Sequence, residues 1–398
     1  MTRSVDDGPG ELRVDPEQIG LFTRDDYYEL LARLRREAPV HRFAPSSWTV
    51  ACYEDVREIS RDPERFCSGR GVLVHDPLRA GGGIEGSLIH MDPPRHGVWR
   101  RVVSRRFTPR AVGRLEARIR EQARAVLDPL APGDAVDVVD AIAAPFPVLV
   151  IAELLGVAHG DRDDFRRWSD AAISTPDAET PAVDDLAALH RFLVEHVKER
   201  RAHPGDDVVS ELVTADVDGR RVSTSEAVGY CLTLLVAGNE TTRHLVSGSV
   251  LALFEHPEQR ALLAREPARI GSAVEECLRW ITPVQAFGRT ATRDTEVHAT
   301  PVRAGDWLVM LYASANRDET VYGPTADRFD VTRPVDSAHL AFGFGEHMCL
   351  GAALARLEGR VMLEELLARF PEYAVAGDPR WTRSTLVRGL ESLPVVLR

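Results

Sequence analysis

The segment Phe342 to Gly351, with the sequence Phe-Gly-Phe-Gly-Glu-His-Met-Cys-Leu-Gly, holds the residues best suited to chemistry. Cys349 precedes an apolar helical pattern, so we expect it at a helix N-terminus. There, unpaired N–H groups and the positive end of the helix dipole stabilise a thiolate. Glycines in the loop allow the backbone to approach the sulfur and a flat macrocycle closely. Because a thiolate binds iron and a thiol does not, the segment predicts a cysteine ligand of iron.

Two other interpretations of Cys349 compete with an iron ligand. Most single cysteines behind a glycine-rich turn are buried structural residues. A zinc site built from His347 and Cys349 would supply two ligands where four are usual. The five cysteines are odd in number and scattered, which argues against a disulfide scaffold. We interpret the other four as small buried hydrophobes: Cys52, Cys67, Cys231 and Cys277.

The loop matches the pattern Phe-Gly-x-Gly-x-His-x-Cys-x-Gly at every fixed position, and in this it resembles the cytochrome P450 family. The resemblance extends from about Phe22 to the C-terminus. It implies that Cys349 is the proximal ligand of haem b, with Phe342 and Gly351 beside the cofactor. It also implies the fold of that family, which is mainly α with a small β portion, a long central helix over the haem and the cysteine loop beneath it.

A second match lies in the segment Ala237-Gly238-Asn239-Glu240-Thr241-Thr242, which is similar to the oxygen-activating segment of the family. The resemblance implies that Gly238 leaves room for dioxygen and that Thr241 hydrogen-bonds the distal oxygen. Glu240 would relay protons. Taken alone, an acid and two threonines on a helix are equally compatible with an exposed face.

Glu276-Cys277-Leu278-Arg279 fits the Glu-x-x-Arg motif of the family. The i,i+3 spacing places both charges on one side of a helix, where a surface ion pair would contribute little. The resemblance implies a buried pair joined by a later arginine, for which Arg328 in Ala326-Asp327-Arg328-Phe329 is the match. These three residues are expected to support haem loading and to take no part in the chemistry.

Four cationic or polar groups match the contacts of the haem propionates. His96 and Arg100 are spaced i,i+4, so their side chains share one helical face and suit a carboxylate. Arg289 and His347 match two further propionate contacts. Each is more often a surface charge when considered alone, but together they would neutralise two carboxylates that otherwise resist burial.

Four segments correspond to those that shape the substrate cavity in the family, and the side chains expected there are Val284 and Phe287. Gly81-Gly82-Gly83, within the first segment, suits a mobile lid. The segments are 72–89, 168–189, 284–287 and 384–389.

The elements that must position these residues are mostly helical. Ser223 and Glu226 have the spacing of a capping box, and the apolar pattern that follows runs to Glu255, before His256-Pro257. Other helices are expected at 25–37, 267–280 and from near Cys349 to before Pro371. Short strands are expected at 40–43, 48–51, 289–292, 297–299 and 307–311. We expect a polar tail over 1–20 and one domain over 21–398, with β structure near 38–52 and 284–315.

The net charge of −12 argues against a general nucleic-acid binder, which needs a basic surface. Neither a targeting segment nor an apolar run long enough for a bilayer is evident, so we expect a cytoplasmic protein. The sequence between Arg95 and Arg120 contains nine arginines and one acid, Glu116. This stretch is either a solvated helix face or a docking patch for an acidic iron–sulfur ferredoxin.

The sequence thus predicts a monomeric haem-dependent monooxygenase that uses dioxygen and two externally supplied electrons to hydroxylate or epoxidise a hydrophobic small molecule. Candidate substrates are a terpenoid, steroid, fatty acid, polyketide or aromatic compound. No flavin or nicotinamide fingerprint is evident, so electrons should come from NAD(P)H through a ferredoxin reductase and a ferredoxin. A peroxide-driven enzyme and a non-catalytic protein of the same fold are the alternatives. Glu240-Thr241 disfavours the first, and Cys349 disfavours the second.

Overall fold

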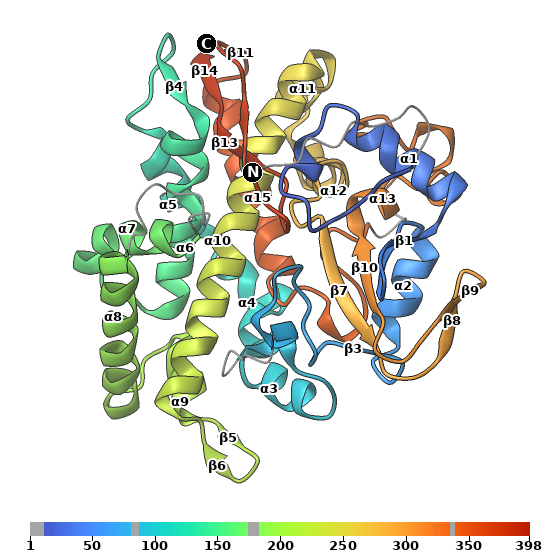
Figure 1. Ribbon diagram of the computed structural model, residues 1–398. Coiled ribbons are helices and arrows are strands. Elements are labelled where there is room, and N and C mark those ends of the chain that lie inside the picture. Colours follow the sequence, from blue (N-terminus) through green and yellow to red (C-terminus); the bar gives the residue numbers. More distant parts are fainter. Residues whose placement is uncertain (1–11, 81–86, 174–182, 335–338) are drawn as a thin grey trace.

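The computed structural model describes residues 12–80, 87–173, 183–334 and 339–398, and helices dominate this part of the chain (Figure 1). The helix α10 crosses the centre of the molecule, with α6, α7 and α8 on one side and a β-sheet on the other (Figure 1). The helices are α1 (Tyr27–Glu37), α2 (Tyr53–Arg61), α3 (Arg95–Ser104), α4 (Pro109–Gly113), α5 (Glu116–Leu127), α6 (Pro145–Leu155), α7 (Arg162–Ile173), α8 (Val183–Ala202), α9 (Val208–Thr214), α10 (Thr224–Glu255), α11 (Pro257–Arg265), α12 (Ile270–Ile281), α13 (Tyr312–Ala315), α14 (Glu319–Tyr322) and α15 (Ala352–Arg369).

The strands form one larger sheet, in the order β1-β2-β10-β7-β3, and several small ones. Within the larger sheet β2 and β10 pair in parallel, and the other neighbours pair antiparallel. Its main strands lie in the two regions where β structure was expected, and the short β3 is an addition. The strands are β1 (Val40–Ala44), β2 (Ser47–Val50), β3 (Phe66–Cys67), β4 (Ala135–Asp137), β5 (Asp216–Val217), β6 (Arg220–Arg221), β7 (Ala286–Ala291), β8 (Thr295–Val297), β9 (Thr300–Val302), β10 (Trp307–Leu311), β11 (Tyr373–Val375), β12 (Arg380–Trp381), β13 (Leu390–Ser392) and β14 (Pro394–Leu397).

The start of α10 confirms the predicted capping box. The Ser223 hydroxyl accepts from the Glu226 N–H, and the Glu226 carboxylate accepts from the Ser223 N–H, so two otherwise unpaired donors are satisfied. The helix has 32 residues, which corresponds to roughly 48 Å at ~1.5 Å per residue. It therefore reaches across the whole helical part and packs against α6, α8, α12 and α15.

The predicted strand over 297–299 is wrong, because β8 ends at Val297 and β9 begins at Thr300. His298 and Ala299 between them form the turn, with φ of 47° and 57°. This left-handed conformation is uncommon for residues other than glycine, asparagine and aspartate. The sequence His298-Ala299 therefore contains none of the residues from which a tight turn is usually predicted.

The last long helix, α15, begins at Ala352, three residues after Cys349, with Gly351 as its N-cap. The cysteine thus lies just before the helix start and not within it. Val14 is 1% exposed and packs with Leu21 and Phe22, so residues 12–20 of the predicted tail contribute a side chain to the core. Among the helices of the described ranges, none is both long and apolar enough to cross a bilayer.

Candidate active site

A cavity of about 240 Å³ beneath α10 brings together residues that are far apart in the sequence. Its lining includes side chains from α3, α10, α15, the sheet and the cysteine loop. The glycines Gly81 to Gly83, expected to form a lid, lie outside the described residues. Of the predicted cofactor, catalytic and substrate residues, those that line the cavity are His96, Arg100, Gly238, Thr241, Val284, Phe287, Arg289, Phe342, His347, Cys349 and Gly351.

The cysteine loop is closed by backbone hydrogen bonds. The Cys349 N–H donates to the carbonyl of Phe342 over 2.8 Å, and the Met348 N–H donates to the carbonyl of Gly345 over 3.1 Å. Gly345 has a φ of 72°, and a Cβ there would overlap the backbone oxygen of Ser60 in α2. The glycine is therefore required both by its backbone conformation and by the close approach of α2.

The Cys349 side chain is exposed and lines the cavity. Burial among the surrounding protein atoms raises the pKa of its thiol above the ordinary value, whereas the Gly351 N–H and the guanidiniums of Arg100 and Arg356 lower it. The helix start thus lowers the pKa of the thiol as predicted, but burial acts in the opposite direction and raises it. A bound iron ion would supply the further positive charge that a thiolate needs.

Two buried side chains at the edge of the cavity have unused hydrogen-bond donors or acceptors. His96 is 2% exposed, and its Nε2 has no hydrogen-bond partner among the described residues. Arg289 is 6% exposed, and within the described ranges the only hydrogen bond of its side chain is to the carbonyl of Gly288. Burial lowers the pKa values of both side chains, that of His96 to about 4. A buried guanidinium without a carboxylate is costly, so these two groups fit an anionic ligand.

Arg100 and His347 complete this edge and also contact protein atoms. Arg100 Nη2 donates to the carbonyl of Met348 over 2.6 Å, which ties α3 to the cysteine loop. His347 Nε2 lies 3.1 Å from the hydroxyl of Ser68, and its ring centroid lies 4.2 Å from that of His96. Together with Cys349, the four side chains fit a flat, iron-bearing macrocycle with two carboxylates, which is what haem b presents.

Thr241 faces the cavity from α10. Its hydroxyl donates to the carbonyl of Ala237 over 2.6 Å, so its oxygen lone pairs are free to accept a hydrogen bond on the cavity side. Gly238, one turn earlier, also lines the cavity, and a Cβ there would meet the side chain of Ile151 from α6. The glycine therefore allows α6 to pack closely where the cavity is formed.

Glu240 is not among the residues that line the cavity. Its Oε1 lies 3.9 Å from Nε2 of His244, one turn later on α10. His244 is 2% exposed, and neither ring nitrogen has a hydrogen-bond partner in the described part of the chain. A proton from Glu240 therefore has no direct path to the cavity in this conformation.

A second buried acid, Glu358 of α15, was missed by the sequence analysis. It lines the cavity, and its Oε2 accepts from the hydroxyl of Thr242 over 3.4 Å. Burial raises the pKa of Glu358 to about 8, so it is mostly protonated at neutral pH. The only feature of the sequence that could have indicated a buried acid here is the position of Glu358, nine residues after Cys349 on an apolar helix.

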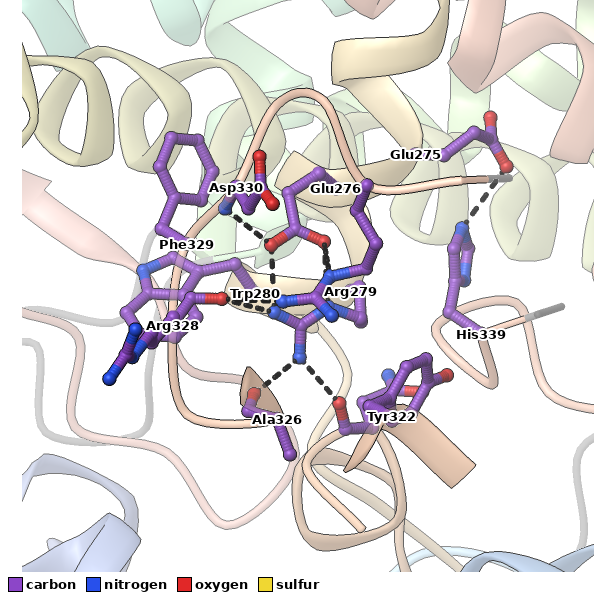
Figure 2. Close-up of polar contacts among 12 residues, drawn as sticks. Glu275, Glu276, Arg279, Trp280, Tyr322, Ala326, Arg328, Phe329, Asp330 and His339 are labelled. Atoms are coloured by element: carbon purple, nitrogen blue, oxygen red, sulfur yellow. Dashed lines mark hydrogen bonds and ion pairs between the residues drawn. The ribbon is translucent and has the colours of Figure 1, made fainter. Parts of the chain in front are cut away.

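The predicted pair of Glu276 and Arg279 on α12 is buried, with each side chain 2% exposed. Figure 2 shows how Arg279 is surrounded by acceptors. It donates to both carboxylate oxygens of Glu276 and to the carbonyls of Asn316, Ala326 and Arg328. All five of its N–H groups are therefore satisfied.

The prediction for Arg328 is corrected by the structure. Arg328 is exposed and contributes its carbonyl oxygen to the cluster, as Figure 2 shows. The guanidinium that joins the pair belongs to Arg333, whose Nε donates to Glu276 Oε2 over 3.0 Å. The chain reverses between the two residues, with the Asp330 N–H also bound to Glu276, so the later arginine is the one that points inward.

The remainder of the cavity wall is mainly apolar. Val72, Leu88 and Ile89 from the first predicted segment line it together with Val284 and Phe287. No described residue of 168–189 or 384–389 does so. Six further residues of α10 line the cavity and were not predicted to do so: Tyr230, Thr233, Leu234, Ala237, Thr242 and Leu245. Ala237, Leu234 and Thr233 precede Thr241 by four, seven and eight residues, a spacing that identifies the same helical face.

Comparisons with known proteins agree with this site. Residues 269–383 match the family model described as Cytochrome P450. The chain is 35% identical to the linalool 8-monooxygenase of Pseudomonas putida over 97% of its length and 99% of the relative. It is 40% identical to the erythromycin C-12 hydroxylase of Saccharopolyspora erythraea, with 96% of each chain covered. Among solved structures it is similar to Mycobacterium marinum CYP268A2 in complex with pseudoionone, with a TM-score of 0.86, 35% identity and coverage of 95% and 97%.

Proposed function

The chain belongs to the cytochrome P450 family and is a haem-dependent monooxygenase, and we propose that it oxidises an apolar molecule held beneath α10. The observation that carries the proposal is that Cys349, Thr241, the unpaired Nε2 of His96 and a buried Arg289 without a carboxylate partner share one cavity. Such an enzyme requires a cysteine that ligates the iron, a hydroxyl group in the cavity that can hydrogen-bond oxygen, and polar or cationic side chains that bind the two haem propionates. The predicted fold, activity and cofactor are confirmed at the level of the family.

Haem b supplies the iron at which dioxygen is bound and reduced, and the protein supplies binding, orientation and electrostatics. Cys349 would ligate the iron, and the Gly351 N–H near the sulfur would moderate its electron donation. His96, Arg100, Arg289 and His347 would neutralise the propionates. Contact with the propionates would explain why these four side chains, which are costly to bury, lie in the cavity wall.

Thr241 would position a water molecule or a protonated oxygen atom, because its lone pairs face the cavity. Glu240 would relay protons toward Thr241 through rotation of that side chain or through an ordered water. Glu358 is a second acid, next to Thr242, and its raised pKa keeps it protonated at neutral pH.

The substrate would be hydrophobic, since Val72, Leu88, Ile89, Val284 and Phe287 present apolar surface. The relatives support the same class, because their names include linalool, erythromycin, vitamin D(3) and steroid substrates. These compounds differ greatly in size and shape. The choice among terpenoid, steroid, fatty acid, polyketide and aromatic substrates is best made by screening for compounds that shift the spin state of the iron.

Electrons would arrive at the cysteine side from a separate ferredoxin that is reduced through a ferredoxin reductase by NAD(P)H. Arg57 and Arg61 stack on Phe344 of the cysteine loop at 4.7 and 5.2 Å, and Arg356 stacks on Phe342 at 4.6 Å. Arg101 and Arg105 of the predicted patch are exposed close by. Arg106 is instead paired with Asp206 and Glu211, so it offers less charge to a partner. This arrangement suits an acidic partner.

The decisive experiment is the carbon-monoxide difference spectrum of the reduced, haem-loaded protein. A red-shifted, thiolate-type Soret band is expected, and its absence in folded protein would contradict the assignment of Cys349. Substrate oxidation that needs ferredoxin and reductase, and that peroxide cannot replace, distinguishes the monooxygenase from a peroxide-driven enzyme. A monomeric state and a cytoplasmic location remain predictions, which size-exclusion chromatography and cell fractionation can test.

A further inference from the structure

A cluster of three potential metal ligands lies outside the haem cavity, where α2 begins. Cys52, Asp55 and His298 offer a sulfur, an oxygen and a nitrogen atom that all lie within 4.8 Å of one another. The Nδ1 of His298 lies 2.9 Å from Oδ2 of Asp55. None of these residues lines the cavity, so the cluster has no part in the monooxygenase site.

The first two ligands are placed by the helix itself. Cys52 is the N-cap of α2 and Asp55 lies in its first turn, so the two side chains share one side of the helix. Two intervening residues are also the separation found between paired ligands in many zinc sites. The Cys52 thiol does not cap the helix and instead donates a hydrogen bond to the carbonyl of Arg35 over 3.9 Å, which an ion would replace.

The third ligand is placed by the turn between β8 and β9. His298 and Ala299 both have positive φ, where asparagine and glycine are the usual residues. This conformation is unfavourable for residues that carry a side chain. It directs the imidazole toward Asp55, and the His298 side chain remains 49% exposed. One position around a bound ion would therefore stay open to water.

The surroundings of the cluster are rich in negative charge. Asp55 is 12% exposed, and burial raises the pKa of its carboxyl despite the contact with His298. Burial, together with the carboxylates of Asp318 and Asp55, raises the pKa of the Cys52 thiol to about 12. A cation that binds here must displace the thiol proton, which lowers the affinity relative to a preformed thiolate site.

We propose that Cys52, Asp55 and His298 form a zinc site with three protein ligands and one open position, which joins α2 to the β8–β9 turn. Thiolate, imidazole and carboxylate are together typical of Zn²⁺, whereas Ca²⁺ and Mg²⁺ prefer oxygen ligands alone. Ligand atoms around a tetrahedral zinc lie roughly 3–4 Å apart, given bonds of about 2.0–2.3 Å. The ligand atoms of the three residues, which lie within 4.8 Å of one another, therefore need to move only slightly closer by side-chain rotation to bind zinc.

The site would stabilise the helix that supports the cysteine loop. The far end of α2 contacts that loop, because the backbone oxygen of Ser60 lies against Gly345. Ion binding at one end of α2 and the haem ligand loop at the other are thus linked by one rigid helix. Zinc binding is expected to raise the melting temperature of the haem-loaded protein.

The test is equilibrium dialysis of the haem-loaded, untagged protein against zinc chloride, followed by metal analysis. Haem loading matters because His96, Glu346 and His347 form a second cluster of potential ligands, and two of them, His96 and His347, line the cavity. One zinc ion per chain is expected, and Cys52→Ser and His298→Ala should each weaken its binding at least about tenfold. Alkylation of Cys52 by iodoacetamide, followed by mass spectrometry, should be slower in the presence of zinc.

His75→Ala is the matched control, because His75 is exposed and belongs to neither cluster. It should leave zinc binding unchanged. Circular dichroism and the carbon-monoxide spectrum establish that each variant is folded and loaded, and Asp55→Asn gives a nearly isosteric third variant. Failure to bind zinc saturably, or undiminished binding in Cys52→Ser, His298→Ala and Asp55→Asn alike, would overturn the proposal.

Discussion

Arg333 Nε lies 3.0 Å from Glu276 Oε2, so a second guanidinium reaches the carboxylate that Arg279 already holds. The three charged groups belong to two segments, α12 and the irregular stretch before the cysteine loop. Arg333 also donates to the carbonyls of Thr325 and Arg328, which closes that stretch on itself. The cluster therefore fixes the chain that leads into Cys349.

Arg333→Ala should lower the free energy of unfolding by about 1.5–3 kcal/mol, because buried Glu276 loses one charged hydrogen-bond donor but keeps its pair with Arg279. Haem incorporation should fall with it. Arg328→Ala is the matched control and should change both quantities little, since Arg328 contributes only a backbone carbonyl. Denaturant titration and the ratio of haem to protein absorbance measure the two effects. Equal losses in both variants would contradict the assignment of Arg333.

Cys349→Ala should abolish the thiolate-type Soret band of the carbon-monoxide complex while much of the fold is retained. The loop keeps its backbone hydrogen bond from residue 349 to Phe342, which does not depend on the sulfur. Cys52→Ser serves as the control and should preserve the band. Far-ultraviolet circular dichroism checks the fold, and an unaltered Soret band in Cys349→Ala would remove Cys349 as the ligand.

Thr241→Ala should preserve haem binding but divert reducing equivalents to peroxide, because the oriented hydroxyl in the cavity is lost. Thr241→Ser retains a hydroxyl and should restore much of the coupling. The measurement is the ratio of product and peroxide formed to NAD(P)H consumed. Full coupling in the alanine variant would exclude Thr241 from oxygen activation.

Glu358→Gln should stabilise the protein increasingly as the pH rises from about 5 to about 9. The folded-state pKa of about 8 lies above the ordinary glutamate pKa of 4.5. An acid with a raised pKa is favourable to folding below its unfolded pKa, and that advantage is lost as the pH rises through the folded value. The difference is on the order of a few kcal/mol. Melting temperatures of both proteins across this range test the prediction, and a constant difference would contradict the raised pKa.

Arg101→Glu and Arg105→Glu should slow reduction by ferredoxin about tenfold at low salt, with a smaller difference at high salt. Both side chains are exposed, and the neighbouring Arg100 of α3 contacts the cysteine loop. Arg380→Glu, on the distant strand β12, is the control and should change the rate little. Stopped-flow reduction under carbon monoxide measures the rates. Kinetics that do not respond to charge reversal or salt would place the docking surface elsewhere.

The sequence was most informative where local chemistry decides the structure. The capping box at Ser223 and the proline after His256 defined α10 at both ends, and the apolar run of β10 was predicted with its observed bounds. The glycine-rich loop around Cys349 was predicted in the same way. In each case the signal lies within a few neighbouring residues.

Tertiary contacts explain what the sequence could not predict. Arg328 and Arg333 lie in one irregular segment, and only its fold decides which guanidinium meets Glu276. Glu240 was placed at the cavity because it adjoins Thr241, but neighbours on a helix point about 100° apart, and it faces His244. The turn at His298 was missed because its left-handed conformation depends on contacts outside the hairpin.

The parallel pairing of β2 with β10 has a consequence for how the molecule is made. Trp307 pairs with Ser47, so β2 cannot gain that neighbour until some 260 further residues have left the ribosome. Until then the β1–β2 hairpin has an unpaired edge that can associate with other chains. At ~5–20 residues per second this interval is on the order of 10–50 s. The nascent chain thus keeps an open strand edge during most of its synthesis, and chaperones that cover apolar strands would act during that interval.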